Sequence, residues 1–87
     1  MESVIGVKPR EDFSLELWFS TGEHRWFDAR PYLNQGVFTR LQDIDLFKQA
    51  FVALDTVCWP GHLDIAPETL YDRSVPLPTE HHSVVDS

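Results

Sequence analysis

The sequence predicts an α+β fold in which short helices accompany an antiparallel sheet. Residues 13–19 alternate apolar and polar side chains, which is the two-residue period of a half-buried strand. Two short apolar runs lie on either side of Asp55, as the strands of a hairpin do. Pro67 and Glu68 suit the first turn of a helix, where proline loses no hydrogen bond and a carboxylate faces the free N–H groups. We therefore expect a three-stranded N-terminal meander, a two-stranded C-terminal element and two or three short helices.

The N-terminal meander begins with a strand over residues 4–8, which Pro9 ends because it lacks an N–H donor. The second strand covers residues 13–19 and has its apolar side chains on one face. A turn signal follows at residues 20–23 and leads into a third strand over residues 24–28. The apolar face consists of Phe13, Leu15, Leu17 and Phe19.

The turn between the second and third strands sets which residues face each other. With Thr21 and Gly22 as a two-residue tip, Trp18 is expected opposite Arg25 on the face that does not form the core. The same register pairs two positions on the core face: Phe19 with His24, and Leu17 with Trp26.

The middle of the chain predicts short helical segments. Pro31 is expected to open a single helical turn that Gly36 closes. Asp43 is a favoured N-cap for a helix over residues 44–49, since its side chain can accept hydrogen bonds from the first N–H groups. A last short helix is expected to begin at Pro67.

The C-terminal strands are expected over residues 51–54 and 56–59. The turn between them is poorly specified, because Leu54-Asp55 is not a favoured pair for a two-residue hairpin loop.

Chain length and composition indicate how many domains the chain forms. A chain of 87 residues has room for one domain, and its eleven aromatic residues can supply most of a core. We expect a single domain over residues 1–74 and a flexible tail over residues 75–87, where the composition shifts to Pro, Ser, Thr, His and Val.

Charge and cysteine content narrow the class of protein. Seven Lys and Arg against fourteen Asp and Glu give a net charge of −7, which disfavours direct nucleic-acid binding and favours a basic protein partner. The same acidity also serves to keep a small domain soluble. A single cysteine excludes an internal disulfide and suits a reducing compartment. No apolar run approaches the ~18 residues of a membrane span, and residues 1–3 lack the pattern of a secretory signal. We expect a cytoplasmic protein that binds neither membrane nor nucleic acid.

Several spaced segments resemble one family pattern. They comprise the turn at residues 20–22, the end of the third strand, a stretch over residues 31–47, and residues 59–71. The matching residues are Ser20, Gly22, Phe27, Asp28, Pro31, Tyr32, Leu33, Gly36, Val37, Phe38, Leu41, Phe47, Trp59, Gly61, Asp64, Pro67, Glu68, Leu70 and Tyr71. On these residues the chain is similar to the bacterial family known only as domain of unknown function 2442. Thr21 departs from the pattern, in which an acidic residue or Asn is common, and so does Pro60, which directly follows the strand tryptophan.

The resemblance implies a small α+β domain with an antiparallel sheet, and it implies no activity. Some relatives are fused to a helix-turn-helix DNA-binding domain, and others are encoded beside a second small protein in a toxin–antitoxin-like arrangement. By analogy, the resemblance implies a regulatory or partner-binding role.

Cys58, His62 and Asp64 are the candidates for chemistry. A zinc site needs three or four converging ligands, and a thiol with an imidazole is also the pair needed for nucleophilic catalysis. The alternative is that Cys58 is a small buried apolar residue and His62 belongs to a turn. The sequence favours this second interpretation, so we expect no catalytic residue, no metal and no cofactor.

Trp18 and Arg25, with Glu16 beside them, form the candidate binding surface. Trp and Arg are enriched at the centres of protein interfaces, and an open sheet edge can also accept a partner's strand. The alternative places the aromatic residues in the core and at its rim. The sequence predicts a non-catalytic interaction module that binds a protein partner or a second copy of itself. A small metal-binding protein or enzyme that uses Cys58, His62 and Asp64 is the alternative.

Overall fold

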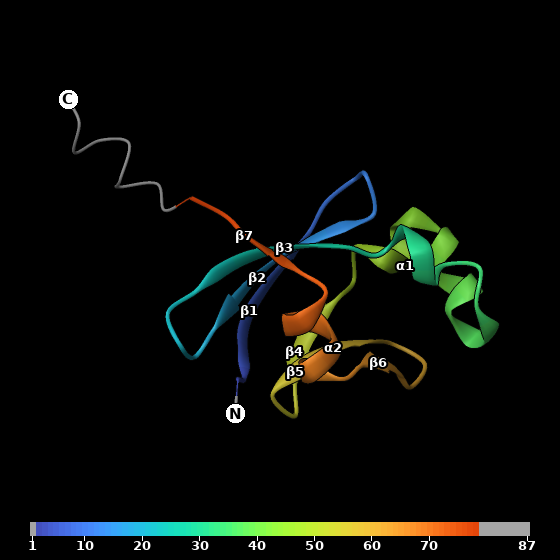
Figure 1. Ribbon diagram of the computed structural model, residues 1–87. Helices are drawn as coiled ribbons and strands as arrows, with labels where there is room; N and C mark the ends of the chain where they lie inside the picture. Colours follow the sequence, from blue (N-terminus) through green and yellow to red (C-terminus); the bar gives the residue numbers. More distant parts are fainter. Residues whose placement is uncertain (1, 79–87) are drawn as a thin grey trace.

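The computed structural model describes residues 2–78 and contains two antiparallel sheets (Figure 1). The first sheet has four strands in the order β1-β2-β3-β7, and the second has three in the order β4-β5-β6. The predicted α+β class, with an antiparallel sheet and few short helices, is confirmed. The strands are β1 (Val4–Pro9), β2 (Ser14–Phe19), β3 (His24–Asp28), β4 (Phe51–Ala53), β5 (Thr56–Trp59), β6 (Leu63–Ile65) and β7 (Val75–Pro76).

The β2–β3 hairpin has a three-residue loop, so the predicted register is wrong by one residue. Phe19 N–H donates to Glu23 O, and Gly22 N–H donates to Phe19 O. Gly22 has φ 92°, the left-handed conformation that ends a three-residue hairpin loop. The observed pairs are Leu17 with Arg25, Glu16 with Trp26, and Trp18 with His24. The extra loop residue therefore moves Arg25 to the core side of the sheet and Trp26 to the opposite side.

Side chains of both sheets form one buried cluster. Trp59 is almost fully buried there, and its indole N–H donates to Phe47 O at 2.8 Å, so burial leaves no polar atom of this residue unpaired. The helices contribute Leu41, Phe47 and Leu70. The sheets contribute Val4, Leu15, Leu17, Phe19, Phe27, Val57, Trp59, Leu63 and Ile65.

The middle of the chain forms two 3-10 helices, η1 (Arg30–Tyr32) and η2 (Gly36–Gln42), and then α1 (Ile44–Phe47). Asp43 caps α1 as predicted, since its carboxylate accepts a hydrogen bond from Asp45 N–H at 3.0 Å. The expected helix over residues 44–49 is two residues too long, and Gly36 begins η2 instead of closing a single turn.

The C-terminal element has a strand beyond the two predicted, because β6 adds to the free side of β5. Three residues are too few to give an alternation signal. The helix α2 (Pro67–Asp72) follows and buries Leu70. No helix in the described range of residues 2–78 is long and apolar enough to cross a membrane.

Val75 and Pro76 form β7, which pairs with β3 at the edge of the first sheet. Leu77 N–H donates to His24 O at 2.8 Å, so the pairing continues one residue further. The division into a domain over residues 1–74 and a flexible tail stays a prediction. Residues 79–87 of that tail lie outside the described residues.

Candidate functional site

Four residues lie side by side on the non-core face of β2 and β3: Glu16, Trp18, His24 and Trp26. We call this surface the tryptophan face. All four residues are half-buried. In the part of the chain that the structure describes, neither tryptophan is among the side chains that form the core or pack against it.

The ring of Trp18 packs between a residue of β3 and a residue of β1. Its ring stacks on the imidazole of His24, with centroids 4.7 Å apart and planes 10° from parallel. On its other side it lies over Gly6 of β1, where an added Cβ would be only 3.3 Å from Trp18 Cε3. A rigid, partly exposed tryptophan presents contact area at low entropic cost.

The polar atoms of the tryptophan face are incompletely paired. Glu16 Oε2 accepts a hydrogen bond from Arg10 Nη1 at 2.8 Å, while Glu16 Oε1 is 3.6 Å from His24 Nε2. His24 Nε2 is buried and has no hydrogen-bond partner among residues 2–78. Buried polar atoms are normally paired, so this nitrogen is an exception whose nearest charged neighbour is the Glu16 carboxylate.

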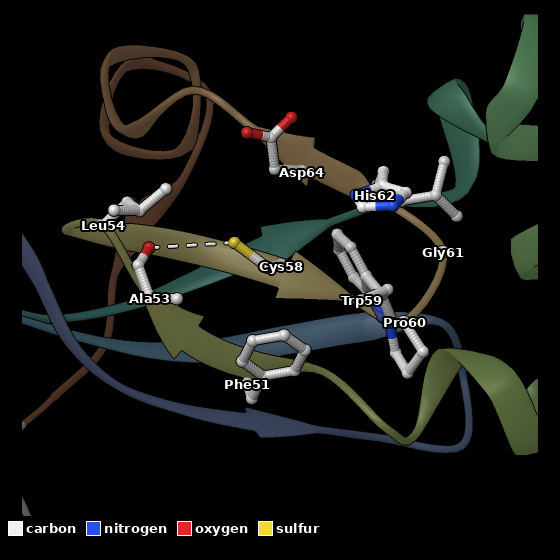
Figure 2. Close-up of a pocket in the computed structure, with 10 residues that line it drawn as sticks. Phe51, Ala53, Leu54, Cys58, Trp59, Pro60, Gly61, His62 and Asp64 are labelled. Atoms are coloured by element: carbon white, nitrogen blue, oxygen red, sulfur yellow. Dashed lines mark hydrogen bonds between the residues drawn. The ribbon is translucent and has the colours of Figure 1, made fainter.

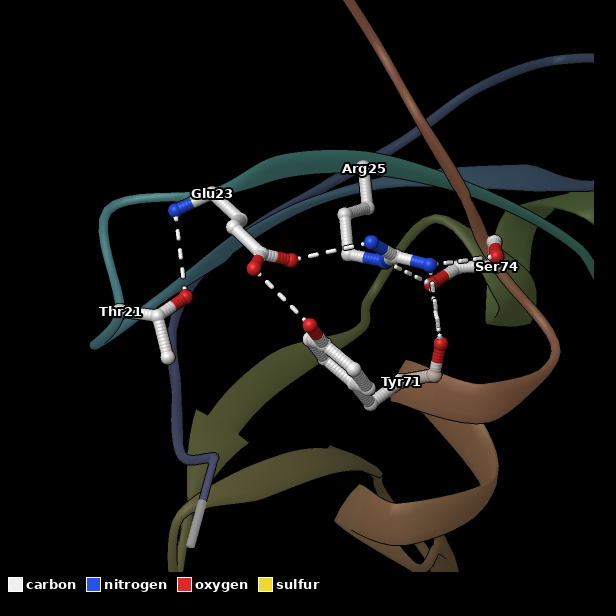
Figure 3. Close-up of polar contacts among 5 residues, drawn as sticks. All are labelled: Thr21, Glu23, Arg25, Tyr71 and Ser74. Atoms are coloured by element: carbon white, nitrogen blue, oxygen red, sulfur yellow. Dashed lines mark hydrogen bonds and ion pairs between the residues drawn. The ribbon is translucent and has the colours of Figure 1, made fainter.

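Arg25 lies on the core side of the sheet and joins β3 to the end of α2 (Figure 3). Its guanidinium donates to the Ser74 hydroxyl at 2.7 Å, to Ser74 O at 2.8 Å and to Tyr71 O at 3.3 Å. Glu23 accepts from both Arg25 and the Tyr71 hydroxyl, at 2.9 Å each. The hydrogen bond to Glu23 is the main cause that raises the pKa of Tyr71.

These contacts use most of the N–H donors of the Arg25 guanidinium. Its Cζ also lies 4.4 Å from the centre of the Tyr71 ring, and only 13% of the side chain is exposed. The structure therefore brings Glu16 and Trp18 onto one face, as predicted, but it does not bring Arg25 to them. Arg25 holds α2 in place.

Cys58, His62 and Asp64 line one hollow on the outer side of the second sheet (Figure 2). Phe51, Cys58 and Asp64 are neighbours across β4, β5 and β6. We call this hollow, which has a volume of about 450 Å³, the Cys58 hollow. Its lining residues are Phe51, Ala53, Leu54, Cys58, Trp59, Pro60, Gly61, His62, Leu63 and Asp64.

The chemistry of the Cys58 hollow does not favour the thiol as a ligand or nucleophile. Burial, and then the negative charge of Asp64, raise the pKa of Cys58. A thiol that holds its proton is a poor nucleophile and metal ligand. Its Sγ lies 3.7 Å from Ala53 O. No group of three His, Cys, Asp or Glu side chains within residues 2–78 is arranged to hold a metal ion.

Sequence reasoning missed His24 and Trp26 on the tryptophan face and Phe51 and Leu54 at the Cys58 hollow. The first two follow from the alternation in β3 once the loop is given three residues instead of two. The sequence does not indicate which face Phe51 and Leu54 occupy, because two apolar neighbours at Val52 and Ala53 obscure the period.

A family model described as "Protein of unknown function (DUF2442)" matches residues 4–76. The chain belongs to this family. The DUF2442 match spans both sheets and α2, so it includes the tryptophan face and the Cys58 hollow. No curated protein and no solved structure matches the chain. The predicted family is therefore confirmed.

Proposed function

We propose that this DUF2442 domain is a non-catalytic interaction module whose tryptophan face binds a protein partner of basic net charge. The observation that carries the proposal is the position of Trp18 and Trp26, two large aromatic residues that share one sheet face and lie outside the core that residues 2–78 form. Aromatic residues that are rigid and partly exposed are the usual anchors of protein interfaces.

The charge of the chain supports a basic partner over a second copy. Each copy carries a net charge of −7, so two copies repel each other while a basic partner is attracted and steered. On the tryptophan face, Glu16 Oε2 is already paired with Arg10, but Glu16 Oε1 accepts no hydrogen bond within residues 2–78. This oxygen beside the rings of Trp18 and Trp26 favours an arginine or lysine side chain, which can contact both the rings and the carboxylate.

The family analogy supports a regulatory role exerted through a separate partner, as in a toxin–antitoxin-like pair. Direct contact with nucleic acid is disfavoured by the net charge, so any effect on transcription passes through that partner. The single free cysteine supports a cytoplasmic location, where thiols stay reduced.

The experiment starts from quantitative capture of partners from native lysate on the immobilised domain, in parallel with the Trp18→Ala and Trp26→Ala variants. Val37→Ala is the matched control, because Val37 is an exposed apolar residue away from the tryptophan face. The partner selected must then be purified and titrated. We expect each tryptophan variant to weaken its binding by about tenfold or more, while Val37→Ala leaves it unchanged.

Two results would overturn the proposal. One is that every captured protein binds the tryptophan variants as tightly as the original chain, although circular dichroism shows that the variants are folded. The other is a dimer of the domain in sedimentation velocity that either tryptophan variant dissociates, since the tryptophan face would then be occupied by a second copy.

A further inference from the structure

The Cys58 hollow is a second exposed surface, formed by different strands from the tryptophan face. We propose that it binds a short basic peptide segment, with an apolar side chain in the hollow and a neighbouring lysine or arginine against Asp64. This occupant is defined by the lining of the hollow, by the backbone of the two turns beside it, and by charge.

The lining suits one apolar side chain. Ala53 and Cys58 are small and half-buried, while the larger Phe51 and Leu54 remain exposed beside them. Figure 2 shows Cys58 between Phe51 and Asp64 in the middle of the sheet. The volume of about 450 Å³ is within the size of ordinary ligand pockets.

The two turns that border the Cys58 hollow hold unusual backbone conformations. Among residues 2–78, four non-glycine residues have positive φ, and three of them are in these turns: Leu54 (54°), Asp55 (67°) and His62 (67°). Asp and His adopt this conformation more readily than most residues, so it is costly mainly at Leu54, and costly backbone conformations cluster at functional sites.

Leu54 is the least expected of the three. It is the first residue of a two-residue turn between Ala53 and Thr56, a position that Asn or Gly fills without strain. Leu54 is also 88% exposed, so burial in the monomer does not explain why an apolar residue stands there. A partner's apolar side chain packed against it would give this residue a role.

Charge selects a cationic neighbour for that apolar group. Asp64 is the only acidic residue that lines the Cys58 hollow, and none of the five ion pairs found in the described part of the chain includes it. Arg40 lies at one edge of the Cys58 hollow, where its Nη1 donates to Gly61 O at 3.4 Å and forms no ion pair with Asp64. The net charge of −7 disfavours an acidic segment or a second copy.

The test uses the peptide acetyl-Phe-Lys-amide, titrated at millimolar concentration into the ¹⁵N-labelled domain. We expect saturable shifts of the backbone amides between residues 51 and 64, and no saturation with acetyl-Phe-Glu-amide or acetyl-Ala-Lys-amide. Asp64→Asn is expected to weaken the binding about two- to fivefold, the scale of one partly exposed ion pair. Asp72→Asn removes the same charge from an exposed site on α2 and is expected to leave it unchanged.

A second variant, Leu54→Asn, is expected to weaken binding as well while keeping the fold, because Asn fits the left-handed turn. Trp18→Ala is expected to bind acetyl-Phe-Lys-amide like the original chain. The peptide titration therefore tests the Cys58 hollow independently of the proposed partner binding at the tryptophan face. Equal binding of the Phe-Glu peptide, shifts confined to β2 and β3, or no saturable shift with acetyl-Phe-Lys-amide would overturn the proposal.

Discussion

Replacing Leu54 by asparagine is expected to make the domain more stable, although it removes an apolar residue. Leu54 has φ 54° and Asp55 has φ 67° in the turn between β4 and β5. Both central residues of this turn thus need the left-handed conformation, as in a type I′ hairpin loop. Leucine pays a steric cost there that asparagine largely avoids, because its short side chain tolerates this conformation.

The structure allows the two opposing contributions to be estimated. A left-handed conformation costs an ordinary residue about 1–2 kcal/mol. Leu54 is 88% exposed, so only about an eighth of its surface is lost from water. Full burial of a leucine is worth about 1.5–3 kcal/mol, which leaves about 0.2–0.4 kcal/mol to be lost on substitution. The relief of strain is larger, and Leu54→Asn should raise the free energy of unfolding by about 0.5–1.5 kcal/mol.

Urea unfolding followed by tryptophan fluorescence measures this difference, and thermal unfolding should show a midpoint higher by about 2–10 °C. The matched control is Val37→Asn. Val37 is 61% exposed and does not have positive φ, so asparagine relieves nothing there and the change should stay within about 0.5 kcal/mol. If Leu54→Asn is neutral or destabilising while Val37→Asn behaves as expected, the left-handed turn does not strain the leucine and the reasoning is refuted.

Four further outcomes follow from the contacts described above. Arg25→Met keeps the unbranched aliphatic part of the side chain but loses its bonds to Ser74 O and Tyr71 O, so urea unfolding should show a loss of about 2–4 kcal/mol. A loss below about 1 kcal/mol would contradict the role of Arg25 in holding α2. Gly61→Ala should destabilise by more than Gly36→Ala in the same assay, because φ 93° at Gly61 lies outside the left-handed region open to residues with a side chain, whereas φ 50° at Gly36 lies within it. The hydrogen bond from Arg30 lowers the pKa of Asp28. This carboxylate therefore stabilises the fold fully above its unfolded pKa of about 3.9, and the contribution is lost as pH falls through the lower folded pKa. Asp28→Asn should be less stable than the original chain at neutral pH, and the difference should vanish in strong acid. Because burial raises the pKa of Cys58, iodoacetamide should modify Cys58 more slowly than it modifies the thiol of free glutathione at the same pH. Asp64→Asn should accelerate the modification of Cys58. A rate above that of glutathione would show a reactive thiol.

The sequence predicts the class of fold and the core face of β2 well, because the alternation over residues 13–19 is long and regular. It does not determine the register of the β2–β3 hairpin, since Ser20-Thr21-Gly22 is compatible with a two-residue tip or a three-residue loop. The position of glycine is the usable signal. A left-handed residue is needed at the last position of a three-residue loop, and Gly22 occupies that position.

Contacts outside the two turns hold the C-terminal element together where the local sequence signal is weak. The Leu54-Asp55 turn has poor local preference, yet Asp55 O accepts a hydrogen bond from Val4 N–H at 2.9 Å, which ties the turn to β1. Thr56 Oγ1 donates to Ile65 O and joins the start of β5 to the end of β6. The contact between Val4 and Asp55 joins residues that no short window of sequence contains, and such contacts override local propensity.

The candidate sites also differ in how well the sequence predicts which residues lie together. Cys58, His62 and Asp64 lie on one short hairpin, and the structure does bring them to one hollow. Trp18 and Arg25 are separated by a turn whose length the sequence leaves open, and one residue of difference in that length puts them on opposite faces. A side chain within a single strand is easier to place from sequence than a pair across a turn.

The three tryptophans have different surroundings, and this difference bears on whether binding and folding can be separated. Trp59 is buried, and its N–H is bonded to Phe47 O, so its substitution would damage the core. Trp18 and Trp26 are neither in the core nor packed against it within residues 2–78, and α2 is fastened from the other side of the sheet by Arg25. Substitutions on the tryptophan face therefore remove contact surface while leaving in place the interactions that close the fold. For that reason, a loss of partner binding in Trp18→Ala or Trp26→Ala reports on recognition, whereas the same loss in Arg25→Met reports on the position of α2.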